Sequence, residues 1–210
     1  PAEQMNLFED KLLDVNHKQD YCIIGQLFDT YWLIEFEDSF YMMDQHAAHE
    51  KILYERLMKQ FHEKTYHSQM IMPPVILTLS LREEQILKEN WKTFTALGYE
   101  IEEFGGKEYK VTGLPAELPT VIDCKQLLIE LIDTIADESA THDPERITEK
   151  VASMSCKAAV KGNNRLSFKE AEELMRELME AENPYNCPHG RPTLIKMTKY
   201  EIERKFKRIL

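Results

Sequence analysis

The chain has 210 residues, 43% of them hydrophobic and 30% charged, a composition that supports a packed apolar core and argues against intrinsic disorder. No apolar run reaches the roughly 18 residues that span a bilayer, the N-terminus lacks a signal-peptide pattern, and four widely spaced cysteines favour a reducing compartment. The formal net charge of −11 argues against nucleic-acid binding, because phosphates repel an acidic surface. We therefore expect a fragment of a longer protein that does not span a membrane.

The N-terminal part of the chain is predicted to be mostly β-strands, followed by a helix. Residues 1–20 are polar and weakly patterned, as expected for the end of a linker. Short runs of β-branched, aromatic and apolar residues then predict a meander of three strands over 21–28, 31–36 and 39–43. Apolar residues that recur at helical spacing predict a helix over 47–61.

A second unit, predicted to be a compact insertion, begins at the pair Pro73-Pro74. A capping box at Ser80 predicts the start of a helix that Gly98 ends. The other predicted elements are strands over 75–79, 99–104 and 108–112 and a helix over 124–136.

The C-terminal part is predicted to return to a mainly helical structure. Helix start and stop signals predict helices over 143–162 and 167–182. A strand over 193–197 and a short helix capped by Thr198 complete the predicted elements.

The densest group of chemically active side chains lies where a strand gives way to a helix. His46 and Glu50 are four residues apart, so on a helix they share one face and could converge on one ion, with Asp44 just upstream. Taken alone, the same pattern also fits a helix N-terminus that acidic residues stabilise, with a half-buried histidine.

A second group lies in the sequence Cys-Pro-His-Gly-Arg-Pro at 187–192, a short loop that proline and glycine stiffen. Cys187 and His189 could supply two ligands to a zinc-like ion, and Arg191 could hold a carboxylate or a phosphate with two hydrogen bonds. The alternative is a loop with one buried cysteine and one solvated histidine. A helical cysteine such as Cys156 is, taken alone, a small core residue.

Four patterns together resemble one family. Asp-Gln-His-Ala-x-x-Glu-x-x-x-x-Glu covers residues 44–55, (Ala/Ser)-Cys-(Lys/Arg) covers 155–157, and the Cys-Pro-His-Gly-Arg-Pro loop is followed by Phe-x-Arg at 206–208. In order and spacing, almost the whole chain resembles the C-terminal domain of the MutL family of DNA mismatch-repair proteins, in its endonuclease-bearing bacterial form. Family members without nuclease activity lack the long acidic motif and the Cys-Pro-His loop.

The resemblance implies a divalent-metal-dependent endonuclease that nicks one strand of duplex DNA. Its catalytic residues would be Asp44, His46 and Glu50. Its metal ligands would be His46, Glu50, Cys156, Cys187 and His189. A mixed set of N, O and S ligands favours zinc, which would be structural or regulatory, and manganese would be the catalytic ion. Glu55 and Arg191 would contact the metal ligands without binding the metal themselves, for example through a salt bridge.

The start of the insertion carries a further short motif, Gln-Met-Ile-Met-Pro at 69–73. It resembles the motif that binds the bacterial sliding clamp. Gln69 would form a hydrogen bond to the clamp and Ile71 would fill a pocket, with Pro73 as the third residue of the pattern. The alternative is an edge strand that the proline ends.

The acidic charge is unevenly distributed along the chain. Residues 1–150 have a net charge of −15, whereas residues 151–210 carry 12 Lys and Arg against 8 Asp and Glu. Phosphate contacts are therefore expected in the basic part, with the candidates Lys157, Lys161, Arg165, Lys207 and Arg208. Because the whole domain is acidic, its own affinity for DNA should be poor and sensitive to salt.

The predicted fold is mixed α/β (α+β) with two subdomains. Residues 21–68 and 146–210 would form a discontinuous dimerisation subdomain with the metal site and a dimer surface on the strands over 21–43. Residues 69–145 would form an external regulatory subdomain. The resemblance implies a homodimer in the bacterial cytoplasm, near the nucleoid. Its partners would be duplex DNA, the sliding clamp and, through the full-length protein, the mismatch-recognition protein MutS.

Two alternatives share these fold predictions. In the first, the domain is a non-catalytic module for dimerisation and partner docking, with a structural zinc site. In the second, Cys156 and Cys187 form a redox- or zinc-sensing thiol pair, and Asp44 has no part in the function.

Overall fold

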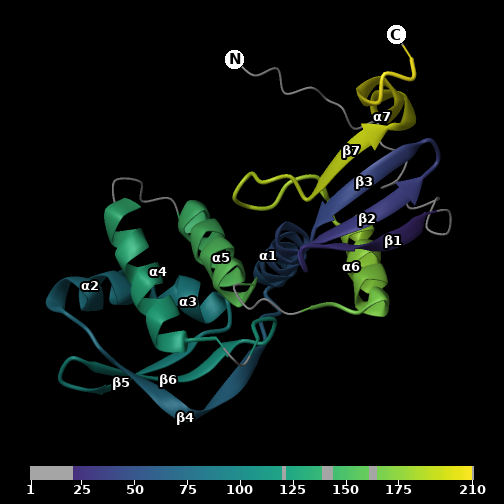
Figure 1. Ribbon diagram of the computed structural model, residues 1–210. Coiled ribbons are helices and arrows are strands. Elements are labelled where there is room, and N and C mark those ends of the chain that lie inside the picture. The colour runs from purple at the N-terminus through teal and green to yellow at the C-terminus, as the bar shows by residue number, and fades with distance from the viewer. Residues whose placement is uncertain (1–20, 120–121, 139–143, 161–164, 210) are drawn as a thin grey trace. The chain divides into compact units, whose positions relative to one another are not determined.

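The computed structural model describes residues 21–119, 122–138, 144–160 and 165–209 (Figure 1). Within these residues it contains seven helices and two antiparallel sheets, so the predicted α+β class is confirmed. The predicted linker at 1–20 lies outside the described residues.

Two compact units make up the chain, and the second is inserted into the first. Unit 1 comprises Pro1–Ile52 and Asn163–Leu210, and unit 2 comprises Leu53–Gly162. The boundaries lie elsewhere than the expected 68/69 and 145/146, because Leu57 and Val151 belong to the hydrophobic core of unit 2. The dimerisation and regulatory roles of the two units stay predictions.

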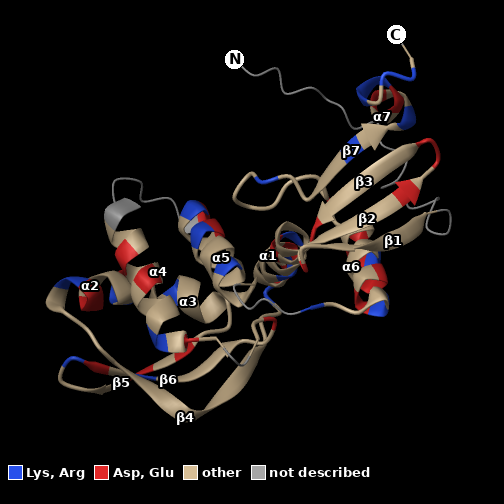
Figure 2. Ribbon diagram, in the orientation of Figure 1, with Lys and Arg blue, Asp and Glu red and all other residues tan. Residues whose placement is uncertain are grey.

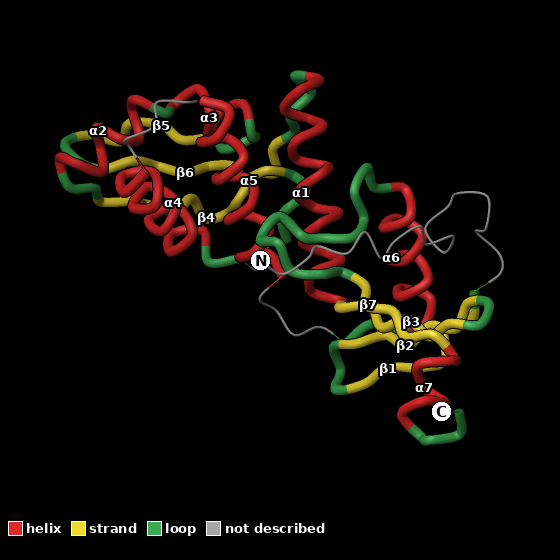
Figure 3. Tube along the Cα trace, turned by 90° about the horizontal axis from the view of Figure 1, so that it is seen from above, coloured by secondary structure: helices red, strands yellow, loops and turns green. Residues whose placement is uncertain are grey.

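Unit 1 is built on a four-stranded antiparallel sheet. Its strands, in spatial order, are β1 (Cys22–Leu27), β2 (Tyr31–Phe36), β3 (Ser39–Asp44) and β7 (Leu194–Thr198). Side chains alternate between the two faces, so Trp32, Ile34 and Phe36 are buried together on one of them. Helix α6 (Phe168–Glu180) covers this face with an apolar stripe (Figures 1 and 3). Helix α7 (Lys199–Lys205) follows β7.

Unit 2 is built on a three-stranded antiparallel sheet with helices on one face (Figure 1). The strands, in spatial order, are β4 (Ser68–Thr78), β6 (Glu108–Pro115) and β5 (Glu100–Gly105). The helices are α2 (Leu81–Glu89), α3 (Trp91–Ala96), α4 (Cys124–Glu138) and α5 (Pro144–Val160). Helix α1 (Gln45–Glu63) begins in unit 1 and ends in unit 2. The core of the unit is aliphatic and aromatic, with Leu87, Phe94 and Leu128 almost fully buried.

Local sequence signals placed most elements. The capping box predicted at Ser80 and the cap predicted at Thr198 are present, and Ser167 also forms a capping box at the start of α6. Two predictions were wrong in extent. The helix expected from Ser80 to Gly98 is two helices, because the backbone leaves helical geometry at Asn90, whose side-chain amide donates to the carbonyl of Ile86. Strand β4 begins well before the predicted residue 75, because its first three residues pair with β6 ahead of an irregular stretch between Met70 and Val75.

Candidate metal centre

A tight turn shapes the loop that carries Cys187 and His189. The Cys187 amide donates to the Arg191 carbonyl at 2.9 Å, and the Gly190 amide donates to the Cys187 carbonyl at 2.9 Å. Gly190 has a φ of 77°, a left-handed conformation that suits glycine and closes the turn. The loop therefore presents the Cys187 and His189 side chains from a fixed backbone.

Thr193 joins this loop to the beginning of helix α1. Its amide donates to the Tyr185 carbonyl at 3.0 Å, and its carbonyl accepts from the Asp44 amide at 2.8 Å. Thr193 is completely buried, so these hydrogen bonds form away from water. Residues from two distant parts of the sequence are thus held side by side within unit 1.

Asp44 caps the N-terminus of helix α1. One carboxylate oxygen, Oδ1, accepts from the amides of His46 at 2.9 Å and Ala47 at 3.1 Å. The His46 Nδ1 atom lies 4.0 Å from the same oxygen, and both side chains are 25% exposed. The motif thus forms a capped helix start with a half-buried histidine, and the catalytic role of Asp44 stays a prediction.

Gln45 is a positioning residue to which sequence reasoning gave no role. Its buried side-chain oxygen accepts from the indole N–H of Trp32 at 3.2 Å and from the side-chain amide of Gln26 at 3.1 Å. These bonds tie the first turn of α1 to strands β1 and β2. The available signal was an uncharged amide that directly follows a strand and opens a helix, in a stretch with a tryptophan to bury.

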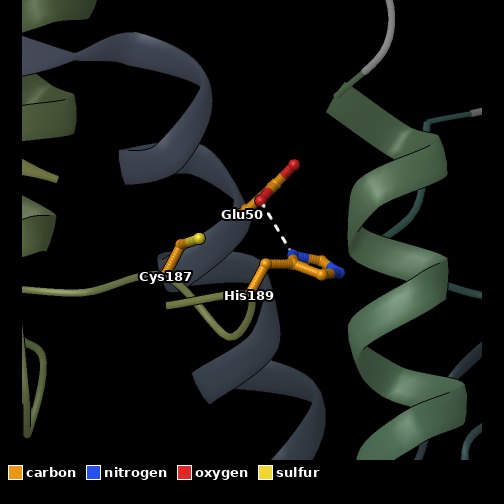
Figure 4. Close-up of side chains that lie close together, drawn as sticks. All are labelled: Glu50, Cys187 and His189. Atoms are coloured by element: carbon orange, nitrogen blue, oxygen red, sulfur yellow. Dashed lines mark hydrogen bonds and ion pairs between the residues drawn. The ribbon is translucent and has the colours of Figure 1, made fainter. Parts of the chain in front are cut away.

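Glu50, Cys187 and His189 converge on one point in unit 1 (Figure 4). One potential ligand atom from each residue lies within 4.8 Å of the other two. Glu50 and Cys187 are buried, and His189 is more exposed. Two of the predicted ligand pairs, one on a helix and one on a loop 137 residues later, thus contribute to a single cluster; we call these three residues the ligand triad.

Arg191 and His189 both contact the buried carboxylate of Glu50. Its Oε2 atom lies 2.6 Å from the guanidinium Nη2 of Arg191 and 3.2 Å from Nδ1 of His189. The hydrogen bond to Glu50 raises the pKa of Arg191 above its ordinary value, and a hydrogen bond with the Cys187 side chain acts in the same direction. The guanidinium therefore faces two of the three residues of the ligand triad.

The donor set of the ligand triad fits a transition-metal ion. A thiolate, an imidazole and a carboxylate are the three ligand types that bind zinc in proteins, and three protein ligands leave a position for a further ligand. His46 is not part of the triad as the described side chains lie. Its roles as ligand and catalytic residue stay predictions, as does that of Asp44.

Comparison with known proteins supports the same assignment that the motifs imply. A family model described as the MutL C terminal dimerisation domain matches residues 24–166. The chain belongs to the MutL family. This confirms the resemblance found in the sequence, and the family description supports a homodimer.

Curated MutL proteins match the chain over most of its length. The DNA mismatch repair protein MutL of Agathobacter rectalis is 52% identical over 203 residues, 97% of this chain and 31% of that protein. The MutL proteins of Caldanaerobacter subterraneus subsp. tengcongensis and Clostridium perfringens are each 38% identical over 95% and 89% of the chain, which are 33% and 28% of those proteins. The chain thus spans about a third of the length of these relatives.

The predicted ligand Cys156 and the predicted supporting residue Glu55 belong to unit 2. Cys156 is fully buried in the core of that unit, and its neighbour Ser155 lies 2.6 Å from the hydroxyl of Tyr99. Ser155 donates to the Val151 carbonyl, so the Tyr99 hydroxyl is the donor to Ser155, and this pair fixes α5 beside Cys156. Glu55 is half-buried on α1. The ligand role of Cys156 and the supporting role of Glu55 stay predictions.

The motif at 69–73 that resembles a clamp-binding motif lies on strand β4, partly in its irregular stretch between Met70 and Val75. The Gln69 side-chain amide donates to the backbone carbonyls of Pro115, at 3.0 Å, and Leu118. Ile71 packs against the core of unit 2, whereas Met70 and Met72 are 76% and 79% exposed. Gln69 therefore forms hydrogen bonds within unit 2. The clamp-binding role of Gln69, Ile71 and Pro73 stays a prediction.

The basic residues expected to contact DNA have different surroundings. Arg165 forms an ion pair with Asp29 at 2.9 Å, and Lys157 is exposed on α5. Lys207 and Arg208 are exposed just after α7, near other Lys and Arg residues of the ribbon (Figure 2). Lys161 lies outside the described residues. Among the described helices, none has the length and apolar character needed to cross a membrane.

Proposed function

We propose that this chain is a metal-dependent endonuclease domain that nicks one strand of duplex DNA during mismatch repair. The observation that carries the proposal is the ligand triad, in which a carboxylate, a thiolate and an imidazole lie within 4.8 Å of one another. The name of its curated relatives, DNA mismatch repair protein, supports the biological process.

The residues of the site would divide the work between binding and orientation. Glu50 and Cys187 would hold a divalent ion from buried positions, and His189 would bind it from the more open side. A divalent ion bound here would supply a Lewis acid that offsets charge on the phosphoryl oxygens of the DNA backbone. The partly exposed carboxylate of Asp44 would orient the attacking water and accept its proton.

We further propose two different metal requirements. The thiolate of Cys187 favours zinc, which would serve a structural or regulatory purpose. Manganese prefers oxygen donors, so it would bind more weakly beside Asp44 and serve the cutting step. His46 and Cys156 are proposed to extend the ligand set.

A plasmid-nicking assay tests the proposed activity. Zinc-loaded protein with added Mn²⁺ at low salt should convert supercoiled plasmid into open circles, and EDTA should stop the conversion. Low salt is needed because an acidic domain is expected to bind DNA weakly and in a salt-sensitive way. Plasmid that stays supercoiled under these conditions contradicts the nuclease assignment.

One observation favours a second candidate function, a non-catalytic docking module with structural zinc. Asp44 already has a complete structural role, because its carboxylate caps helix α1 through His46 and Ala47. This candidate predicts zinc binding and dimerisation without nicking, so the plasmid assay separates the two functions.

We propose that the homodimer forms through the face of the unit 1 sheet opposite α6. Strand register places Leu33, Met42 and Ile195 in one row across this face. Ile195 is 52% exposed. An apolar row on a sheet face, with an aliphatic side chain half-exposed, is suited to pairing with a second copy across a two-fold axis.

Ile195→Glu should therefore weaken the dimer by at least about 100-fold, because the interface would have to bury an unpaired charge. The monomer should stay folded, since the side chain is half-exposed before dimerisation. Sedimentation equilibrium measures the dissociation constant. Phe104→Glu, at a 56% exposed aromatic residue on β5 of unit 2, is the matched control and should leave the dimer unchanged. The opposite pattern would place the interface elsewhere.

We also propose that the motif on β4 binds the bacterial sliding clamp, and that delivery by the clamp and by the remainder of the protein, with MutS, compensates for the poor DNA affinity of this acidic domain. The exposed, irregular part of β4 supports an accessible motif. Gln69 would exchange its bonds to Pro115 and Leu118 for bonds to the clamp.

The double variant Gln69→Ala, Ile71→Ala should lose the stimulation of nicking by the clamp and keep the basal nicking rate. The comparison of nicking with and without clamp measures this. Met70→Ala, at an exposed position that the motif does not specify, should retain full stimulation. Because Gln69 also bonds within unit 2, the thermal unfolding of the double variant must be recorded alongside. If the clamp still stimulates nicking by a folded double variant to the full extent, the proposed clamp-binding role is wrong.

A further inference from the structure

The carboxylate of Glu50 is buried to an extent that requires a compensating cation. Its side chain is 4% exposed, and an ionised carboxylate in such surroundings is costly unless it is paired and hydrogen-bonded. Arg191 supplies the charge at 2.6 Å, and the same guanidinium bonds with the side chain of Cys187. The cation that compensates Glu50 therefore also contacts a second member of the ligand triad.

Arg191 also has the freedom to leave. The side chain of Arg191 is 49% exposed, whereas the side chain of Glu50 is buried. A guanidinium at this position and a divalent ion among the same donors would repel each other and would compete for the Oε2 atom of Glu50. A long side chain at the surface can swing into water at little cost, which a buried arginine cannot do.

We propose that Arg191 is a stand-in cation, which neutralises Glu50 in the metal-free protein and yields its place when a divalent ion binds. This inference rests on the proposed metal centre and not on the nicking reaction. The ion pair with Arg191 would stabilise the arrangement of the ligand triad in the metal-free protein. Metal binding would then exchange one cation for another.

The exchange predicts a sign that separates it from a simple orienting role. If Arg191 stabilises the metal-free protein more than the metal-bound one, its removal must tighten metal binding by the same factor, because the two processes share one thermodynamic cycle. A residue that only orients Glu50 would have the opposite effect, and its loss would weaken metal binding.

The test compares the protein with Arg191→Met, with and without Zn²⁺. In EDTA the variant should melt about 5 °C lower, because a buried charge loses its partner. With saturating Zn²⁺ the difference should fall to less than half. Competition with a fluorescent chelator should show Zn²⁺ binding that is about tenfold tighter in the variant.

Two further variants provide the controls. Arg191→Lys keeps the charge and should melt and bind Zn²⁺ nearly as the unchanged protein does. Arg176→Met removes an arginine that is similarly exposed and pairs with Glu173 and Glu180 on the surface of α6. This variant should change neither the Zn²⁺ affinity nor the dependence of melting on Zn²⁺.

Two results would overturn the inference. Weaker Zn²⁺ binding by Arg191→Met, or an equal loss of melting temperature with and without Zn²⁺, would show that Arg191 orients or supports the site instead. If the unchanged protein binds no Zn²⁺ at all, the proposed metal centre itself fails and the stand-in role fails with it. A double variant with Glu50→Gln tests whether the charge of Glu50 is the cause. In EDTA, removing Arg191 from the Glu50→Gln protein should lower the melting temperature much less than removing it from the unchanged protein.

Discussion

Asp44→Asn is expected to lower manganese-dependent nicking of supercoiled plasmid by at least about 100-fold and to leave the protein folded. The structure explains why the fold should survive. Asp44 caps α1 by accepting two backbone amides with Oδ1, and asparagine is an equally good acceptor at a helix N-cap. The free energy of unfolding should fall by less than about 1 kcal/mol, the part owed to a charge near the helix N-terminus. What the substitution removes is the carboxylate charge and its basicity.

Asp123→Asn is the matched control for this experiment. Asp123 is exposed and caps helix α4 of unit 2, where its Oδ1 atom accepts from the amide of Gln126 at 3.0 Å. The control removes a helix-capping carboxylate that is not part of the ligand triad, so it should nick plasmid at the unchanged rate. Undiminished nicking by a folded Asp44→Asn protein would contradict the proposed catalytic role of Asp44.

Cys187→Ser is expected to weaken Zn²⁺ binding by more than about 100-fold. Loss of a residue that only hydrogen-bonds to a metal ligand already weakens metal binding about 10- to 100-fold. Here the ligand itself is replaced by a hydroxyl that stays protonated at neutral pH. In protein loaded with Co²⁺, the charge-transfer absorption from the thiolate should disappear. The turn should persist, because its hydrogen bonds come from the backbone of Cys187 and not from the side chain.

Cys22→Ser controls for the general loss of a thiol. Cys22 is exposed at the start of β1 and is not part of the ligand triad. The control should keep both the Zn²⁺ content and the charge-transfer band. A Cys187→Ser protein that retains full Zn²⁺ content would mean that the ligand triad does not hold the ion, and the proposed function would lose the observation that carries it.

The elements with strong local signals were the ones that the sequence predicted well. The strands that begin at Tyr31 and Ser39 are short apolar and aromatic runs separated by a polar turn, and the helix that begins after Ser167 has both halves of a capping box. Such signals act over a few residues, so they do not depend on the rest of the fold. The helix from Ser80 to Gly98 failed for the converse reason. A helical pattern continues across Asn90, but the side chain of that residue bonds to the preceding turn and ends it.

The candidate site was predictable in its residues and not in its contacts. Spacing alone put His46 and Glu50 on one helical face, and the loop motif paired Cys187 with His189. The structure selected Glu50 from the first pair and both residues of the second. His46 is instead 4.0 Å from the carboxylate of Asp44, because Asp44 turns back to cap its own helix. Which of two ligands on a helix faces a loop depends on how that loop is anchored.

The sequence by itself determined the family, the α+β class and the types of donor available to a metal ion, because each follows from motifs and periodicities that span a few residues. Only the tertiary structure decided that Thr193 ties the loop to the end of β3, that Gln45 fixes the start of α1 against Trp32, and that Arg191 pairs with Glu50. These contacts join residues from 13 to 149 positions apart. Long-range pairs of this kind are set by the packing of the sheet and its helices, which no local pattern records.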